Sequence, residues 1–269
     1  GFGFGLGIAG AAMATVISQV VVFIVFIFML FFKNHSYISF NLSDFTFSTD
    51  IIWDIIKVGL PASLSMIVMA VGQGVFNKIL VHISVNTVAA YQVAGRLDML
   101  VFLPIFSIAA SLTTLVGMFY GAKEYGALRY IIKYGIFSAL LITIISSTIV
   151  YTFAGHVVRF FTDDASIVVI AVNFLQIFAF AYPFIAVGIT TGRVLQGLGK
   201  GLPVLIITIV RVLGVSAPLA LFFVFIMDKT VEWVWYSMML STIVAFGIGL
   251  TWLISTLKTL PTSGQSLNN

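Results

Sequence analysis

The chain has 269 residues, of which 61% are hydrophobic and 8% are charged, and its mean hydropathy is +1.16. A water-soluble domain of this length could not stay dispersed with so few charges, so the composition indicates an integral membrane protein. The absence of cysteine excludes disulfides and thiolate metal sites, and the net charge of +4 is explained by membrane orientation, with no nucleic acid as a partner.

Seven apolar stretches are each long enough to cross a bilayer, whose hydrocarbon core needs about 20 helical residues. They are too long, and too rich in Leu, Ile, Phe and Ala, to be strands of a β-barrel. The first lacks a basic start and is no signal peptide, and because the sequence opens with Gly1 we expect a fragment that begins inside a longer protein. The predicted transmembrane helices cover 5–32, 51–80, 87–118, 126–153, 165–193, 202–226 and 233–257.

Two polar segments interrupt or end the apolar pattern. Residues 33–50 are the predicted linker between structural units, and residues 259–269 form a predicted disordered tail. Basic residues favour the cytoplasmic side of a membrane. With the linker cytoplasmic, that side holds eight Lys and Arg and the other side three, so we expect the linker and the C-terminus in the cytoplasm of a plasma-membrane protein. The eight are Lys33, Lys57, Lys123, Arg129, Lys133, Arg193, Lys200 and Lys258.

Three charged residues fall inside the apolar stretches, where charge is costly and therefore a functional candidate. Asp98 lies about 16 Å and Arg211 about 14 Å from the nearer ends of their helices, at 1.5 Å per residue. In a core about 30 Å thick, both fall near the midplane. We hypothesise that Asp98 pairs with Arg211 across helices, while Arg96 shares a helix face with Gln92.

These charges have a second interpretation, in which they only hold helices together. Polar contacts between membrane helices often contribute less than about 1 kcal/mol, so stability is a weak reason to keep an ion at the midplane. An ion- or proton-coupling role is favoured for Asp98, and both interpretations stay open for Arg96 and Arg211. The further candidates for a substrate cavity are polar, aromatic or Met residues: Met69, Gln73, Asn77, Tyr91, Gln92, Gln176 and Tyr182.

Prolines inside predicted spans are candidate hinges. Each removes a backbone hydrogen bond, and broken helices at membrane depth are common beside transporter cavities. Proline is also frequent in membrane helices generally, so each is weak evidence by itself. The four are Pro61, Pro104, Pro183 and Pro218.

Sequence patterns for enzymes are not found. The glycine-rich segment 192–201 does not end in the Gly-Lys-Ser/Thr of a nucleotide-binding loop, and no metalloprotease or serine-hydrolase pattern occurs. Lys258 lies at the end of the last stretch and not in its middle, where a retinal-binding lysine would lie. We therefore expect no enzyme and no cofactor, but transport driven by an ion gradient.

Three segments resemble the multidrug and toxic compound extrusion (MATE) family: GLPASLSMIVMAVGQGVFNKIL, VNTVAAYQVAGRLDMLVFLPIFSIAASLTTLVGMFYGAK and FLQIFAFAYPFIAVGITTGRVLQGLGKGLPVLIITIVR. The most specific patterns are A-x-x-x-A-x-R-x-D-x-L-x-x-L-P at 90–104 and the Gly-rich ending at 117–122, where Met118 replaces a frequent Gln. The resemblance covers residues 5–258.

The resemblance implies an all-α membrane fold with seven transmembrane helices. Residues 1–33 would be the last helix of a truncated N-lobe, 34–50 the cytoplasmic linker, 51–258 a complete six-helix C-lobe and 259–269 the tail. The missing N-lobe would be a partner, together with membrane lipid and a small organic substrate. The helices at 51–80, 87–118, 165–193 and 202–226 would line the cavity.

The resemblance also implies a function: efflux of amphipathic, often cationic organic compounds in exchange for H⁺ or Na⁺. Part of the family carries a cation-binding Glu in the helix matching 51–80, but the corresponding residues 69–73 contain no acid. The ion site would be Asp98 or lie in the missing lobe. One alternative is a lipid or lipid-linked oligosaccharide flippase of related architecture, which would need several arginines in its cavity to bind phosphates, where only Arg96 and Arg211 are available. Another is a membrane scaffold or an intramembrane enzyme, in which no cavity would exist.

Overall fold

The computed structural model describes residues 7–32 and 47–261. The chain divides into two units, Gly1–Thr49 and Asp50–Asn269. The described residues contain seven helices long and apolar enough to cross a membrane, as predicted. In the first unit, α1 (Gly7–Phe32) is a single helix, long and apolar enough to cross a membrane.

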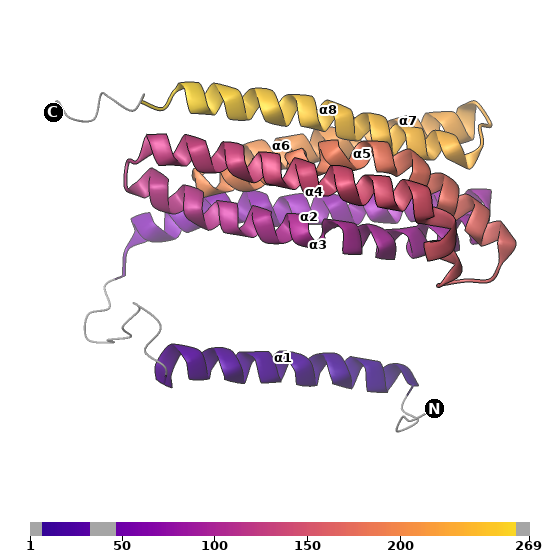
Figure 1. Cartoon of the computed structure of the whole chain (residues 1–269), viewed down its shortest axis with the longest axis horizontal. Coiled ribbons are helices and arrows are strands. Elements are labelled where there is room, and N and C mark those ends of the chain that lie inside the picture. The colour runs from indigo at the N-terminus through magenta and orange to yellow at the C-terminus, as the bar shows by residue number, and fades with distance from the viewer. Residues whose placement is uncertain (1–6, 33–46, 262–269) are drawn as a thin grey trace. The chain divides into compact units, whose positions relative to one another are not determined.

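The second unit is a bundle of antiparallel helices (Figure 1), which confirms the all-α membrane fold. Its uninterrupted helices are α2 (Thr49–Ile83), α3 (Val85–Gly121), α4 (Tyr125–Arg159), α5 (Ala165–Gly197) and α8 (Val231–Lys258). The predicted span 202–226 is divided into α6 (Leu202–Ile209), a π-helix (Val210–Ser216), α7 (Ala217–Leu221) and a second π-helix (Phe222–Ile226). This division was not predicted.

Pro218 gives a physical reason for the division. Because proline has no backbone N–H, the α-helical hydrogen bond to the carbonyl of residue 214 cannot form. π-helical turns flank the short α7 that contains Pro218. By contrast, Pro61, Pro104 and Pro183 lie within helices whose α-helical geometry continues past them. The hinge motion proposed for all four stays a prediction.

Side-chain caps begin two of the long helices. The hydroxyl of Ser84 accepts a hydrogen bond from the backbone N–H of Thr87 at the start of α3. At the start of α5, the Asp164 carboxylate accepts from the backbone N–H groups of Ser166 and Ile167 and from the Ser166 hydroxyl. These bonds favour the charged carboxylate, led by the bond from the Ser166 hydroxyl, and they lower the pKa of Asp164 from its usual value.

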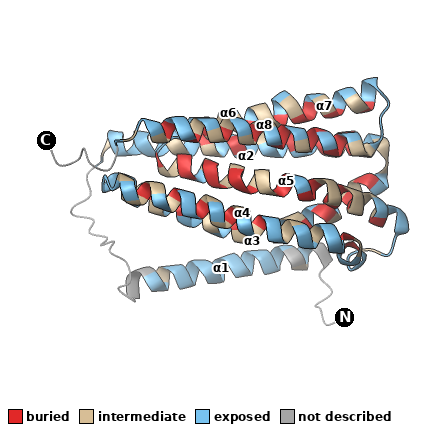
Figure 2. Ribbon diagram, turned by 45° about the horizontal axis from the view of Figure 1, so that its top comes forward, coloured by how far each residue is buried: buried red, intermediate tan, exposed pale blue. Residues whose placement is uncertain are grey.

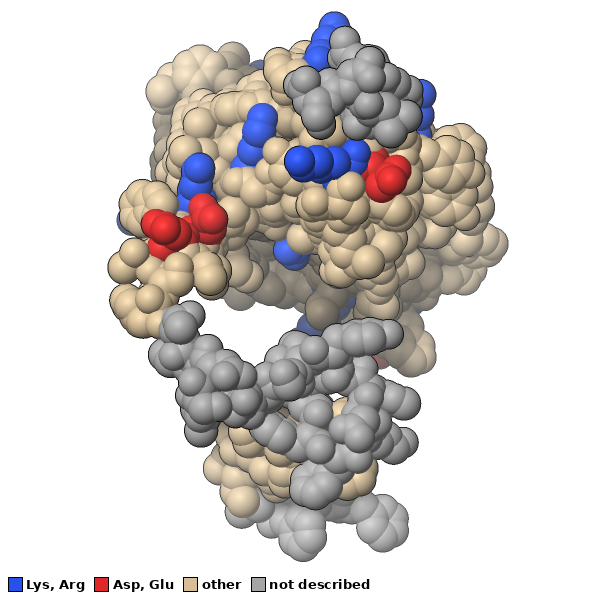
Figure 3. Space-filling view, turned by 90° about the vertical axis from the view of Figure 1, so that its left-hand side faces the viewer, with Lys and Arg blue, Asp and Glu red and all other residues tan. Residues whose placement is uncertain are grey.

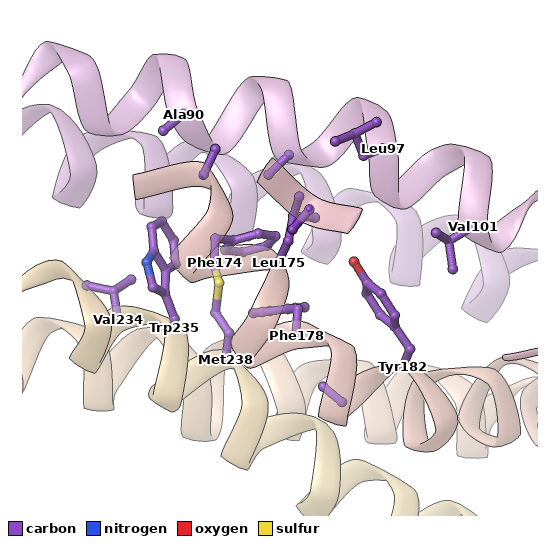
Figure 4. Packing of buried hydrophobic residues seen from close by; sticks show 14 of the residues in the cluster. Ala90, Leu97, Val101, Phe174, Leu175, Phe178, Tyr182, Val234, Trp235 and Met238 are labelled. Carbon is purple, nitrogen blue, oxygen red and sulfur yellow. The ribbon is translucent and has the colours of Figure 1, made fainter. Parts of the chain in front are cut away.

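α5 is the central helix of the bundle. It packs against α3, α4 and α8, and buried residues cover more of it than of its neighbours (Figure 2). Small residues such as Ala171 and Ala186 are fully buried on α5 and allow close helix approach. The large side chains of Phe174, Tyr182 and Trp235 fill the core around them (Figure 4).

The structure describes helical residues on the bundle side of two predicted domain boundaries. Thr49 and Asp50, at the end of the predicted linker, are helical and begin α2, while residues 33–46, Lys33 included, lie outside the described residues. At the other end, the carbonyls of Leu257 and Leu260 accept hydrogen bonds from Arg129 at 3.1 and 2.9 Å. Leu260, which lies in the predicted tail, therefore contacts the bundle, and residues 262–269 lie outside the described residues.

Basic side chains gather at one end of the bundle (Figure 3). The start of α2, the turns from α3 to α4 and from α5 to α6, and the end of α8 lie at this end (Figure 1). The grouping agrees with the charge asymmetry of the sequence. The assignment of this end to the cytoplasm stays a prediction.

Candidate functional site

A cavity of about 520 Å³ opens inside the six-helix unit. Its walls come from α2, α3, α5, α8 and the π-helix Val210–Ser216, so α8 joins the helices expected to line it. The volume lies in the range of small-molecule sites, and the walls are mostly apolar with a few polar groups, as in such sites. The polar lining residues are Gln73, Tyr91, Gln92, Asp98, Arg211, Ser216, Ser241 and Thr242. The large apolar ones are Met66, Met69, Phe76, Phe174, Phe178, Ile185, Val212 and Met238.

The carboxylate of Asp98 is held by a neighbouring helix. The hydroxyl of Tyr182, on α5, donates a hydrogen bond to Asp98 Oδ1, on α3. Figure 4 shows this hydroxyl directed toward α3 near Leu97. The ring of Tyr182 is fully buried and packs edge-on against Phe102, with ring centroids 5.3 Å apart, so the donor is fixed in place. Tyr182 thus orients the Asp98 carboxylate, although Tyr182 itself does not line the cavity.

The hypothesis that Asp98 pairs with Arg211 is wrong. Both residues line the cavity, but among the described residues no hydrogen bond or ion pair joins them. Depth along each helix was inferred from the sequence, whereas contact also requires the two side chains to project toward each other. The rotation of α3 and α5 about their axes brings Tyr182 to Asp98 instead.

Arg211 is positioned by the first π-helix. The next residue, Val212, packs tightly on Gly72 of α2, where a methyl group in place of hydrogen would lie 2.2 Å from Val212 Cγ1. This close approach brings the π-helix against α2 beside the cavity. π-helical turns occur frequently at functional sites. Within the described part of the chain, Arg211 has no hydrogen-bond acceptor and no acidic partner.

The remaining predicted polar residues divide into two groups. Gln73 and Gln92 line the cavity, and Gln92 Nε2 donates to Asn77 Oδ1 at 3.4 Å, which links Asn77 to the wall. Arg96 and Gln176 do not line the cavity, and Arg96 is exposed. Arg96 therefore does not join Asp98 and Arg211 in one cluster.

Aromatic rings form a rigid part of the wall. Tyr91 stacks on Trp235 with ring centroids 5.8 Å apart and packs edge-on against Phe174 at 5.7 Å. Phe174 in turn stacks on Phe178 at 4.2 Å, and Figure 4 shows Trp235, Phe174, Phe178 and Met238 together between the helices. Beside these rings, Met66, Met69 and Met238 line the cavity, and flexible Met side chains adapt to ligands of different shape.

A multidentate metal site is not supported by the described residues, because no group of three His, Cys, Asp or Glu side chains comes together there. Asp98 contributes one carboxylate to the cavity, beside neutral oxygens of Tyr91, Gln73 and Gln92. Such a set can exchange a proton or meet a monovalent or organic cation at Asp98.

Sequence reasoning missed the hydroxyl residues of the wall, Ser216, Ser241 and Thr242. Ser241 and Thr242 donate to the carbonyl of Met238, one turn earlier on α8, at 2.7 and 3.0 Å. Because Ser and Thr make such bonds in any membrane helix, their presence in a span carries little information. No signal in the sequence distinguished these from the other hydroxyl residues of the bundle.

Comparison with known proteins identifies relatives of the whole bundle. The MatE family model matches residues 61–222. The probable multidrug resistance protein NorM of Thermotoga maritima is 28% identical over 220 residues, which are 81% of this chain and 47% of that protein. The multidrug export protein MepA of Staphylococcus aureus is 30% identical over 200 residues, 74% of this chain and 44% of that protein. The chain therefore spans about half the length of the curated relatives it matches.

Solved structures agree with these matches. A MATE protein crystallised in complex with MaL6 superposes with a TM-score of 0.89 at 31% identity, covering 96% of this chain and 58% of that one. A MOP superfamily transporter from Pyrococcus furiosus, described as having a binding pocket of reverse polarity that suggests a different function, gives a TM-score of 0.86 at 31% identity. It covers 97% of this chain and 59% of that one.

Proposed function

The chain belongs to the multidrug and toxic compound extrusion family, and we propose that it supplies the C-terminal lobe of a secondary active efflux transporter. The substrates would be amphipathic, often cationic organic compounds, exported in exchange for H⁺ or Na⁺. A transporter rather than an enzyme agrees with relatives named for multidrug resistance and export. The observation that carries the proposal is the placement of a carboxylate, Asp98, in a cavity walled by Met and aromatic side chains.

Asp98 gives the cavity a way to couple two ligands. The apolar wall would bind the body of the substrate through the hydrophobic effect, and the carboxylate would attract its positive charge. A proton or Na⁺ at Asp98 competes with that positive charge, because one carboxylate cannot neutralise both. The Tyr182 hydroxyl would hold the carboxylate in position throughout the exchange.

Transport also requires the cavity to open alternately to the two sides of the membrane. We propose that a second lobe, matching the rest of the relatives' length, rocks against this bundle within the lipid bilayer. The π-helices beside Pro218 supply a segment without regular α-helical bonding at the cavity wall. The hinge roles of Pro61, Pro104, Pro183 and Pro218 belong to this proposal.

The test is gradient-driven efflux of ethidium from vesicles that contain the complete transporter with this chain. A pH gradient and a Na⁺ gradient are imposed separately, and wild type is compared with Asp98→Asn. The matched control is Asp163→Asn, which makes the same change at an exposed turn outside the cavity. We expect Asp98→Asn to lower the gradient-driven rate at least tenfold at equal expression, while Asp163→Asn keeps the wild-type rate.

The outcomes separate the parts of the proposal. Stimulation by one gradient only identifies the coupling ion. Unchanged efflux in Asp98→Asn would show that coupling lies in the other lobe and that Asp98 is structural. Absence of efflux in the wild type under both gradients would reject drug export.

A further inference from the structure

Arg211 places a positive charge on the wall of the cavity, near the phenol of Tyr91 and without an acidic partner among the described residues. Its guanidinium carries five N–H donors, and none of them meets an acceptor among the described residues. The carboxylate of the same cavity, Asp98, is engaged by Tyr182 and forms no ion pair with Arg211. A charge in such a place is costly unless something from outside the bundle neutralises it.

We propose that Arg211 is the receptor for an acidic group, a carboxylate or phosphate, on an amphipathic ligand of this cavity. The inference rests on the proposed function, because it assigns part of the ligand of the same site. The proposed function assigned the ligand an apolar body, bound by the wall, and a positive group, bound by Asp98. The present inference adds a negatively charged group, bound by Arg211.

The chemistry around Arg211 fits an acidic group. The planar guanidinium binds the two oxygens of a carboxylate or phosphate through parallel hydrogen bonds. The Ser216 hydroxyl and the Gln73 amide line the same cavity and supply further donors. The π-helix packs against α8, and Val212 also contacts Gly72 of α2, so the backbone that carries Arg211 is held by two helices.

The rest of the cavity fits an apolar body attached to that group. Met66, Met69 and Phe76 line the cavity from α2, the helix against which the Arg211 segment packs. A ligand with its acidic end at Arg211 would therefore place its apolar part against Met and aromatic side chains. A small inorganic anion would leave this wall without contact.

The chain contains its own reporter for ligand binding. Trp235 is fully buried and stacks on Tyr91, which lines the cavity, so a bound ligand changes the surroundings of the indole through Tyr91. Replacing the other tryptophans, by Trp53→Phe, Trp233→Phe and Trp252→Phe, leaves Trp235 as the single tryptophan, which is excited selectively at the red edge of its absorption. The full chain in lipid nanodiscs is then titrated with 3-cyclohexylpropanoate and with its uncharged amide.

We expect the carboxylate to bind at least tenfold more tightly than the amide. Arg211→Gln should bring this ratio to about one, and Arg211→Lys should keep part of the preference. Arg96→Gln is the matched control, because it removes an exposed arginine that does not line the cavity, and it should leave the ratio unchanged. Equal binding of acid and amide by the wild type, or a preference that survives in Arg211→Gln, would overturn the proposal.

The source of the acidic group is distinguished by lipid composition. The titration is repeated in discs with and without phosphatidylglycerol. If phosphatidylglycerol competes with 3-cyclohexylpropanoate, and this competition is lost in Arg211→Gln, the acidic group belongs to a lipid headgroup. If phosphatidylglycerol does not compete, the acidic group belongs to a soluble acid. Both results support an acidic ligand at Arg211. The two proposals can be refuted independently. Acid binding without ethidium efflux would refute only the transport proposal, and efflux without a preference for the acid would refute only the role of Arg211.

Discussion

The contact between Gly72 and Val212 offers a direct test of how the cavity wall is built. In Gly72→Ala, the new methyl carbon would lie 2.2 Å from Val212 Cγ1. Carbon atoms in favourable contact lie about 3.5–4.0 Å apart, so the overlap exceeds about 1 Å. Val212 cannot easily turn away, because a β-branched side chain has one strongly preferred rotamer in a helix. The helices must separate or the side chain must adopt a strained rotamer.

The expected cost of Gly72→Ala is about 1–3 kcal/mol in the free energy of unfolding, the range for overpacked cores. Reversible unfolding of the purified chain, followed by circular dichroism in mixed micelles with increasing denaturing detergent, measures this difference. Val212→Ala removes the methyl group that clashes. The double variant Gly72→Ala/Val212→Ala should therefore be less destabilised than the sum of the two single variants, by about 1–2 kcal/mol.

Gly74 provides the matched control on the same helix. A methyl group at this position meets no atom within 4 Å, so Gly74→Ala should be neutral or slightly stabilising, by up to about 1 kcal/mol, because alanine favours the helix. Equal destabilisation by Gly72→Ala and Gly74→Ala, or strict additivity in the double variant, would refute the close packing of α2 against the π-helix.

Two further predictions concern the ends of the bundle. Arg129→Met removes two hydrogen bonds to carbonyls at the end of α8 and should lower the free energy of unfolding by about 1–3 kcal/mol. Amide hydrogen exchange at the end of α8 should also become faster. Lys133→Met, at an exposed position of α4, should have neither effect. Asp164 should titrate below the usual pKa of an aspartate in a carboxyl NMR titration, and Ser166→Ala should raise the midpoint of that titration. Because the folded-state pKa is lowered, the stabilising effect of this carboxylate is present above the unfolded-state pKa and is lost as pH falls through the folded-state pKa.

The transmembrane helices could be predicted because their signal is local. An apolar run of 20 or more residues satisfies its backbone hydrogen bonds as a helix wherever it lies in the membrane. The division of the span 202–226 could not be predicted in the same way. Pro218 marks a missing α-helical hydrogen bond, but it does not fix how far the π-helical turns extend on either side, over Val210–Ser216 and Phe222–Ile226.

The candidate site could be predicted as a set of residues but not as a set of contacts. Asp98, Arg211, Gln73 and Gln92 were selected because polar groups at membrane depth are costly, and this reason holds for each residue separately. Which of them meet depends on the rotation of each helix about its axis. Charge attraction suggested Arg211 as the partner of Asp98, yet the phenol of Tyr182 occupies that position.

The two charges that line the cavity suggest how one proton could change its selectivity. Arg211 stays positive at any physiological pH, whereas a carboxylate such as Asp98 can be charged or neutral. With Asp98 charged, the pair has a net charge of zero and can accept a ligand with a positive group at Asp98. With Asp98 protonated, the net charge becomes +1, which repels a cation and favours an acidic group at Arg211. Under the proposed H⁺ exchange, proton binding would therefore expel a cationic substrate through two effects: the substrate loses the negative charge of Asp98, and the net charge of the two side chains becomes +1.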